Sequence, residues 1–109
     1  MKTFLTNAFS LNMVAGTALL QVGECAPESV PVNAISAIGH KETAEVVSEL
    51  LGRKVEANRV PVTLDKGDTA CVVTLFTLDS KPFRPPEGRV LTADELRQLK
   101  VVVRSVTVL

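Results

Sequence analysis

Residues 58–78, "NRVPVTLDKGDTACVVTLFTL", carry the strongest local pattern in the chain. Two apolar, β-prone runs, residues 58–64 and 69–78, flank Asp65-Lys66-Gly67-Asp68, whose Gly and Asp residues suit a tight turn. We therefore predict a β-hairpin. The second run is apolar on both faces, which places it inside a sheet that is covered on each side, whereas Pro61 indicates that the first run lies nearer an edge.

Before this region, residues 41–51 have helical periodicity. Ala44, Val47, Leu50 and Leu51 recur at helical spacing, and Gly52 is a suitable C-terminal stop. The sequence predicts an amphipathic helix with one buried stripe, and we expect Lys41, Glu42, Glu45 and Glu49 to form a solvated face without a function.

The rest of the chain completes an α+β (α/β) pattern. Strands are expected at residues 1–6, 17–22 and 101–109, and Thr92-Ala93-Asp94-Glu95 has the spacing of a capping box that starts a short helix. We predict a small single domain, residues 1–109, with a mixed, mainly antiparallel sheet of about five strands flanked by helices. Valine-rich exposed strands favour a homodimer.

Composition limits the function classes. Twelve basic and twelve acidic side chains cancel, which disfavours binding along duplex DNA. Cys25 and Cys71 lie far apart without a metal-binding spacing, so neither a metal site nor a disulfide framework is indicated. The N-terminus loosely imitates a lipoprotein signal, but Asn7, Asn12 and Gly16 interrupt its apolar run. We expect no membrane partner and a cytoplasmic location.

His40 is the one histidine, and it stands where the predicted helix begins, in "AIGHKETA", residues 37–44. Free backbone N–H groups and the positive end of the helix dipole attract anions there, phosphate above all. A neighbouring phosphodiester would help His40 donate a proton near neutral pH. The alternative is that His40 merely caps the helix. The local pattern leaves both open.

The chain contains three further motifs besides "AIGHKETA": "NAFSLNM" (7–13), "NRVPV" (58–62) and "FRPPEGRVLT" (83–92). Together, and in their order along the chain, the four motifs resemble those of a family of ring nucleases, small anti-CRISPR proteins of archaeal viruses with bacterial CRISPR-associated relatives. Members of that family degrade cyclic tetra-adenylate, the second messenger of type III CRISPR immunity. The similarity covers most of the chain and is weakest from residue 16 to 32.

The resemblance implies roles for individual residues. His40 would be the catalytic general acid, and Arg84 and Glu87 a pair that shapes the active site. The implied ligand-binding residues are Asn7, Ser10, Asn12 and Arg59. It also implies a homodimer that clasps one ring between its subunits and uses no metal or other cofactor.

The sequence departs from the family pattern at two places. Pro85 and Pro86 stand between Arg84 and Glu87, after a longer approach, "LDSKPF", which implies a stiffer and longer lid. Thr74 replaces a glutamine that some relatives carry.

Other functions remain open at this stage. The protein could bind the ring, or another small nucleotide, without cutting it; a nucleic-acid-binding regulator is disfavoured because stacking aromatics are scarce. Individual residues also have simpler interpretations. Arg59 could be a solvated charge, Arg84 and Glu87 a surface ion pair, and Ser10 a turn residue.

Overall fold

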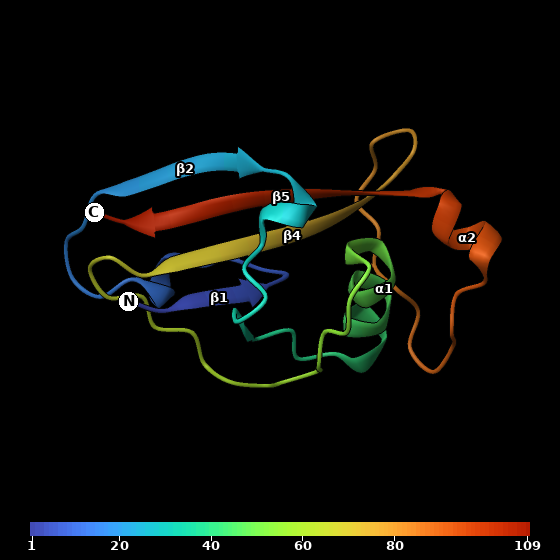
Figure 1. Ribbon diagram of the computed structural model, residues 1–109, viewed down its shortest axis with the longest axis horizontal. Coiled ribbons are helices and arrows are strands. Elements are labelled where there is room, and N and C mark those ends of the chain that lie inside the picture. The colour runs from blue at the N-terminus through green and yellow to red at the C-terminus, as the bar shows by residue number, and fades with distance from the viewer.

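The computed structural model describes residues 1–109, which form one five-stranded mixed sheet in the order β2-β5-β4-β1-β3 (Figure 1). The strands are β1 (Thr3–Thr6), β2 (Leu20–Cys25), β3 (Ile35–Ser36), β4 (Thr69–Thr77) and β5 (Leu99–Val108). The helices are α1 (Lys41–Leu51) and α2 (Ala93–Arg97), with 3-10 turns η1 (Leu11–Met13) and η2 (Pro27–Ser29). The predicted α+β class and mixed five-stranded sheet are confirmed.

β4 is the middle strand, as its apolar character on both faces predicts. It pairs antiparallel with β5, with Val73 opposite Val103, and parallel with β1, with Phe4 beside Ala70. The edges are β2, antiparallel to β5, and β3, parallel to β1. β1 ends at Thr6, opposite Val72, so the second half of β4 extends past it.

The prediction that residues 58–64 pair with β4 in a hairpin is wrong. Residues 58–64 form no strand, and Leu64 makes only an isolated parallel bridge with Val14. The turn itself exists, because the Asp68 amide donates to the Asp65 carbonyl at 2.9 Å. However, the Asp68 carboxylate accepts the Lys2 amide at 2.8 Å, and the Thr69 amide donates to the Lys2 carbonyl at 3.0 Å. The N-terminal strand therefore takes the place beside β4 that the preceding segment was expected to fill.

Element boundaries differ from expectation elsewhere. The strand predicted at residues 17–22 lies at Leu20–Cys25, and the last strand begins at Leu99, two residues early. The helix Lys41–Leu51 and its stop agree with the prediction, since Gly52 adopts the left-handed conformation with φ 70°. The predicted capping box is confirmed at Thr92 and Glu95.

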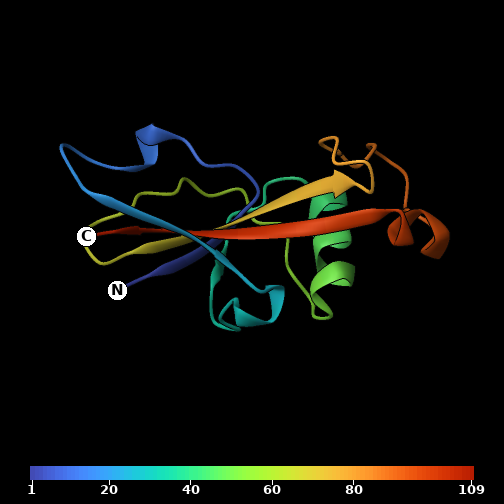
Figure 2. The same ribbon diagram turned by 90° about the horizontal axis from the view of Figure 1, so that it is seen from above.

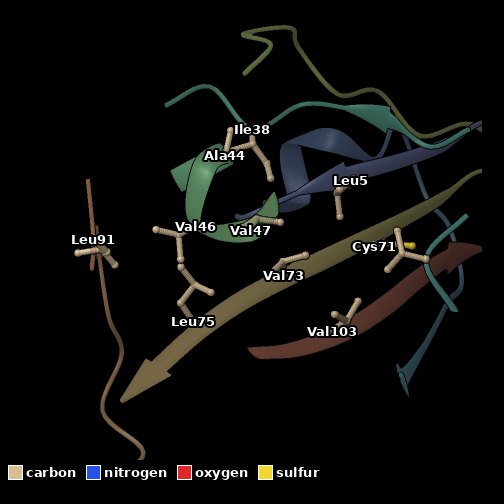
Figure 3. Packing of buried hydrophobic residues seen from close by; sticks show 11 residues of the cluster. Leu5, Ile38, Ala44, Val46, Val47, Cys71, Val73, Leu75, Leu91 and Val103 are labelled. Atoms are coloured by element: carbon tan, nitrogen blue, oxygen red, sulfur yellow. The ribbon is translucent and has the colours of Figure 1, made fainter. Parts of the chain in front are cut away.

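The main core lies between α1 and one face of the sheet (Figure 3). Ala44, Val46 and Val47 of α1 pack toward Val73 and Leu75 of β4. Leu50 and Leu51, which the periodicity also placed in the stripe, are half-buried. Figure 1 shows α1 beside the second half of β4, beyond the end of β1. The start of α1 thereby lies next to the part of the central strand that β1 does not reach.

A second, smaller cluster covers the opposite face. Phe4, Leu64, Ala70 and Val108 are its buried members. Figure 2 shows η1 on one side of the strands and η2 on the other. Residues 58–64 thus contribute to the fold as an irregular cover for the sheet. None of the helices combines the length and the apolar character that a membrane span requires.

Candidate functional site

A pocket of about 200 Å³ lies where the end of β1, the start of α1, the edge of β4 and the loop after β4 meet. Its lining residues come from four separate parts of the chain: Asn7, His40, Glu42, Thr43, Val73, Thr74, Leu75, Pro82, Phe83, Arg84, Pro85 and Glu87. Four of the seven residues predicted for the site, Asn7, His40, Arg84 and Glu87, are therefore together in one pocket.

His40 occupies the N-cap position of α1 with an extended backbone, φ −109° and ψ 128°. Its carbonyl accepts the Ala44 amide at 3.0 Å, but its imidazole makes no capping hydrogen bond. His40 is therefore the N-cap residue of α1 through its backbone, and its side chain takes no part in the capping. The imidazole is exposed in the pocket at the positive end of the α1 dipole, where an anion is favoured.

The backbone before His40 is held on both sides. The Ala37 amide donates to the Leu5 carbonyl at 2.8 Å, and the Asn58 amide donates to the Ile38 carbonyl at 2.8 Å. Ile38 is fully buried in the main core. These contacts fix where His40 enters the pocket, because Ala37 and Ile38, just before it, are bonded to the packed part of the molecule.

Arg59 lies beside this segment, outside the pocket lining. Its side chain passes over Gly39: a Cβ at Gly39 would lie 3.4 Å from Arg59 Nε. Gly39 therefore allows the guanidinium stem to approach the backbone next to His40. The Arg59 side chain is exposed and makes no ion pair, so its cationic head is available to a ligand.

Ser10 and Asn12 are not in the pocket. Ser10 caps η1, where its Oγ accepts the Asn12 amide at 3.2 Å, which agrees with the turn interpretation. Both residues are exposed.

Arg84 and Glu87 enter the pocket from the loop that follows β4. This loop first pairs with the β4 edge, where the Phe83 amide donates to the Leu75 carbonyl at 2.9 Å. Pro85 is buried, whereas the side chains of Arg84 and Glu87 are exposed. The two do not form an ion pair with each other, so the surface-ion-pair interpretation is wrong. Both charges remain free to meet a ligand.

The structure adds lining residues to which the residue pattern alone assigned no role. Thr43, buried to 7% exposure, stands three residues after His40, so one turn of α1 brings it to the same pocket. Glu42 also lines the pocket, and its carboxylate accepts the Gly88 amide at 3.3 Å. Its expected role as a solvated residue without function is therefore incomplete. Thr74, the residue at the glutamine position, lines the pocket from β4.

The lining of the pocket is mixed in charge. The imidazole of His40 and the guanidinium of Arg84 line it together with two carboxylates, those of Glu42 and Glu87. No group of three or more His, Cys, Asp or Glu side chains is arranged to hold a metal ion. Cys71 lies in the main core, outside the pocket, and burial raises the pKa of its thiol, which keeps this side chain protonated. The arrangement supplies one proton donor, one cationic group and helix amides to a bound anion.

Comparison with known proteins agrees with this fold. The family model described as STIV B116-like matches residues 3–103. The chain belongs to the STIV B116-like family. B116 of Sulfolobus turreted icosahedral virus has a solved structure that is similar over 98% of this chain and 99% of that chain, with a TM-score of 0.74 and 27% identity.

Two further relatives of this STIV B116-like protein come from filamentous viruses. ORF116 of Acidianus filamentous virus 1 is 28% identical over 105 residues, which is 91% of this chain and 85% of the relative. Protein 26 of Sulfolobus islandicus filamentous virus is 35% identical over 66 residues, 60% of this chain and 51% of the relative. The family membership thus extends over nearly the whole chain.

Proposed function

We propose that the protein is a ring nuclease that cleaves cyclic tetra-adenylate to linear di-adenylates without a metal ion. The observation that carries the proposal is the uncapped imidazole of His40 at the start of α1, in one pocket with Arg84, Glu87 and Asn7. These four residues belong to three of the four motifs that resemble those of the ring nucleases. By destroying the messenger, the protein switches off type III CRISPR effectors in the cytoplasm of a prokaryotic cell.

The chemistry follows from the residues present. A ribose 2′-OH attacks the adjacent phosphorus in line, the 5′-oxygen leaves, and a 2′,3′-cyclic phosphate remains. His40 protonates the leaving oxygen as general acid, because it is the one histidine in the chain and an imidazole is the side chain most often used for this role. Arg84 and the α1 amides stabilise charge on the non-bridging oxygens. Glu87 gives at most weak help in removing the 2′-OH proton.

The proposed reaction requires a homodimer that encloses the ring. A pocket of about 200 Å³ is smaller than the ~300–1,000 Å³ typical of small-molecule sites, so one subunit does not enclose four nucleotides. A ring of four identical nucleotides has a two-fold axis, as a homodimer has, and two copies of His40 then face opposite phosphates. Ser10, Asn12 and Arg59, exposed outside the pocket, are available to bind the parts of the ring that extend beyond it.

The second candidate is a module that binds the ring without cutting it. The observation in its favour is that the pocket contains a single imidazole and therefore no second histidine to act as base. Such a protein would act as a sponge for the messenger. Binding alone would need the same arginines and the same dimer, but it would not need the imidazole as a proton donor.

The test compares the native protein with a His40→Ala variant. Both are incubated in EDTA with labelled cyclic tetra-adenylate or cyclic hexa-adenylate, and products are separated by chromatography. We expect di-adenylates from the tetra-adenylate ring and a rate that falls ~10²–10⁴-fold in the variant, with binding largely kept. A ring that is retained but uncut by the native protein would establish the binding module instead. If the native protein neither cuts nor binds the ring, both functions are refuted.

A further inference from the structure

Segment 84–88 carries Arg84 and Glu87, and it is attached to the rest of the molecule at few points. Before it, Phe83 is bonded to the β4 edge, and after it Leu91 is buried in the main core. Within the segment, Pro85 is buried, and one hydrogen bond connects the backbone to another element. That bond joins the Gly88 amide to Glu42 Oε2, across 46 residues of sequence.

Glu42 is well placed for such a contact. It lies in the first turn of α1, two residues after His40, where the helix dipole stabilises a carboxylate. Its side chain lines the pocket with His40, and it also borders a second hollow that Arg89 and Leu91 line. Glu42 thus stands between the catalytic side of the pocket and the segment that returns to the core.

Gly88 makes the contact possible from the other side. Its φ of 72° lies in the left-handed region, which glycine adopts without strain. The chain reverses there, and the amide after Glu87 points at the Glu42 carboxylate. Because Pro85 fixes one end of the short stretch and Gly88 the other, the position of Glu87 depends on both.

We infer that Glu42 is a positioning residue, whose carboxylate holds segment 84–88 against the start of α1 and so sets where Arg84 and Glu87 stand relative to His40. The inferred effect on catalysis rests on the proposed ring-nuclease function, whereas the attachment itself does not. The contact needs a hydrogen-bond acceptor at residue 42, not a negative charge. A glutamine at this position therefore preserves it, and an alanine removes it.

Limited proteolysis tests the attachment without any substrate. Trypsin does not cut before proline, so Lys81 and Arg84, which precede Pro82 and Pro85, are resistant, and Arg89 is the one tryptic site in the loop. We expect Glu42→Ala to speed cleavage after Arg89 roughly fivefold to tenfold, and Glu42→Gln to leave it near the native rate. Cleavage in residues 53–59 serves as the internal reference.

Glu49→Ala is the matched control, because Glu49 is an exposed acid of the same helix whose side chain makes no hydrogen bond or ion pair. It should be cut at the native rate. Equal cleavage of the native and Glu42→Ala proteins, or a Glu42→Gln protein as open as the alanine variant, would overturn the attachment.

Turnover of cyclic tetra-adenylate tests the catalytic consequence. We expect Glu42→Ala to lower kcat roughly fivefold to tenfold with little change in KM, and Glu42→Gln to restore it. Faster proteolysis with an unchanged kcat would overturn the positioning role. If the native protein does not cut the ring, the proposed function fails, and the proteolysis result still decides whether Glu42 holds the segment.

Discussion

His40 enters the pocket from a helix whose inner face is part of the main core, whereas Arg84 enters from a loop with few attachments. Ile38 and Val47, on either side of His40, are both fully buried. On the loop side, Pro85 is buried, but Arg84, Glu87 and Gly88 are exposed. His40, the proposed general acid, is therefore carried by the packed part of the fold, and Arg84 and Glu87 by a loop with few attachments.

This difference suits the chemistry that we propose. A proton donor must stand at a fixed distance from the leaving oxygen, and packing provides that. Cyclic tetra-adenylate must also enter the pocket, and its products must leave. A loop that opens without unfolding the core allows both. The two sides should consequently respond differently to substitution: changes at the buried residues that anchor the helix should reduce stability, and changes at the exposed residues of the loop should reduce rate with little effect on stability.

The largest stability effect is expected at Ile38. Ile38→Ala removes a fully buried side chain next to Gly39 and His40, and we expect the free energy of unfolding to fall by about 2–5 kcal/mol. Because the chain has no Trp or Tyr, urea unfolding is best followed by far-UV circular dichroism. Val32→Ala, at a side chain that is 89% exposed, is the control and should change stability by less than about 0.5 kcal/mol. Similar costs for both variants would show that the helix side is not anchored as described.

On the loop side, Arg84→Ala should separate rate from stability. We expect kcat on cyclic tetra-adenylate to fall by about 10²-fold, the loss typical when one donor to a developing charge is removed. The free energy of unfolding should change by less than about 0.5 kcal/mol, because the side chain is exposed and unpaired. Lys81→Ala, in the same loop but outside the pocket, should keep the native rate. An Arg84→Ala protein that lost stability in proportion to activity would argue for a structural role instead.

What could be predicted from the sequence depends on whether a feature is decided by neighbouring residues or by distant ones. The helix Lys41–Leu51, its stop at Gly52 and the capping box at Thr92 depend on residues within one or two turns of each other, and all were predicted. The turn at Asp65–Asp68 was also a local feature. The pairing of β1 with β4 was not predicted, because it is decided by contacts of Asp68 and Thr69 with Lys2, some 66 residues away.

The site followed a similar rule. His40, Arg84 and Glu87 were identified from short motifs, and the fold brings them into one pocket with Asn7. Periodicity placed Glu42 on the solvated face of α1, and no pattern in its neighbourhood indicates a contact with Gly88, 46 residues further on. Ser10 and Asn12 lie outside the pocket, so their proposed role depends on ligand or partner atoms that a single chain does not contain.

The smallest effect on stability is expected at the ion pair between Arg89 and Glu95, where the loop rejoins the sheet, and this effect depends on pH. Arg89 donates to both carboxylate oxygens of Glu95, at 2.8 and 2.9 Å, and Thr92 adds its amide at 3.0 Å. These bonds, that from Arg89 above all, lower the pKa of Glu95 from 4.5 to about 2. A lowered pKa in the folded state contributes stability that is fully present above the ordinary value, and this stability is lost as the pH falls toward about 2.

Glu95→Gln removes this contribution and so tests how the loop end is held. We expect the native protein to be slightly more stable at neutral pH, and the two unfolding curves to converge as the pH falls from 4.5 toward about 2. The pair is exposed, so the difference at neutral pH should be small and should shrink further in high salt. Urea unfolding at a series of pH values, at low and high salt, measures both effects. A difference that persisted at low pH, or that salt left unchanged, would mean that Glu95 acts through the neutral hydrogen bonds of the capping box, and the loop would then be held at this end by the short helix rather than by its charge pair.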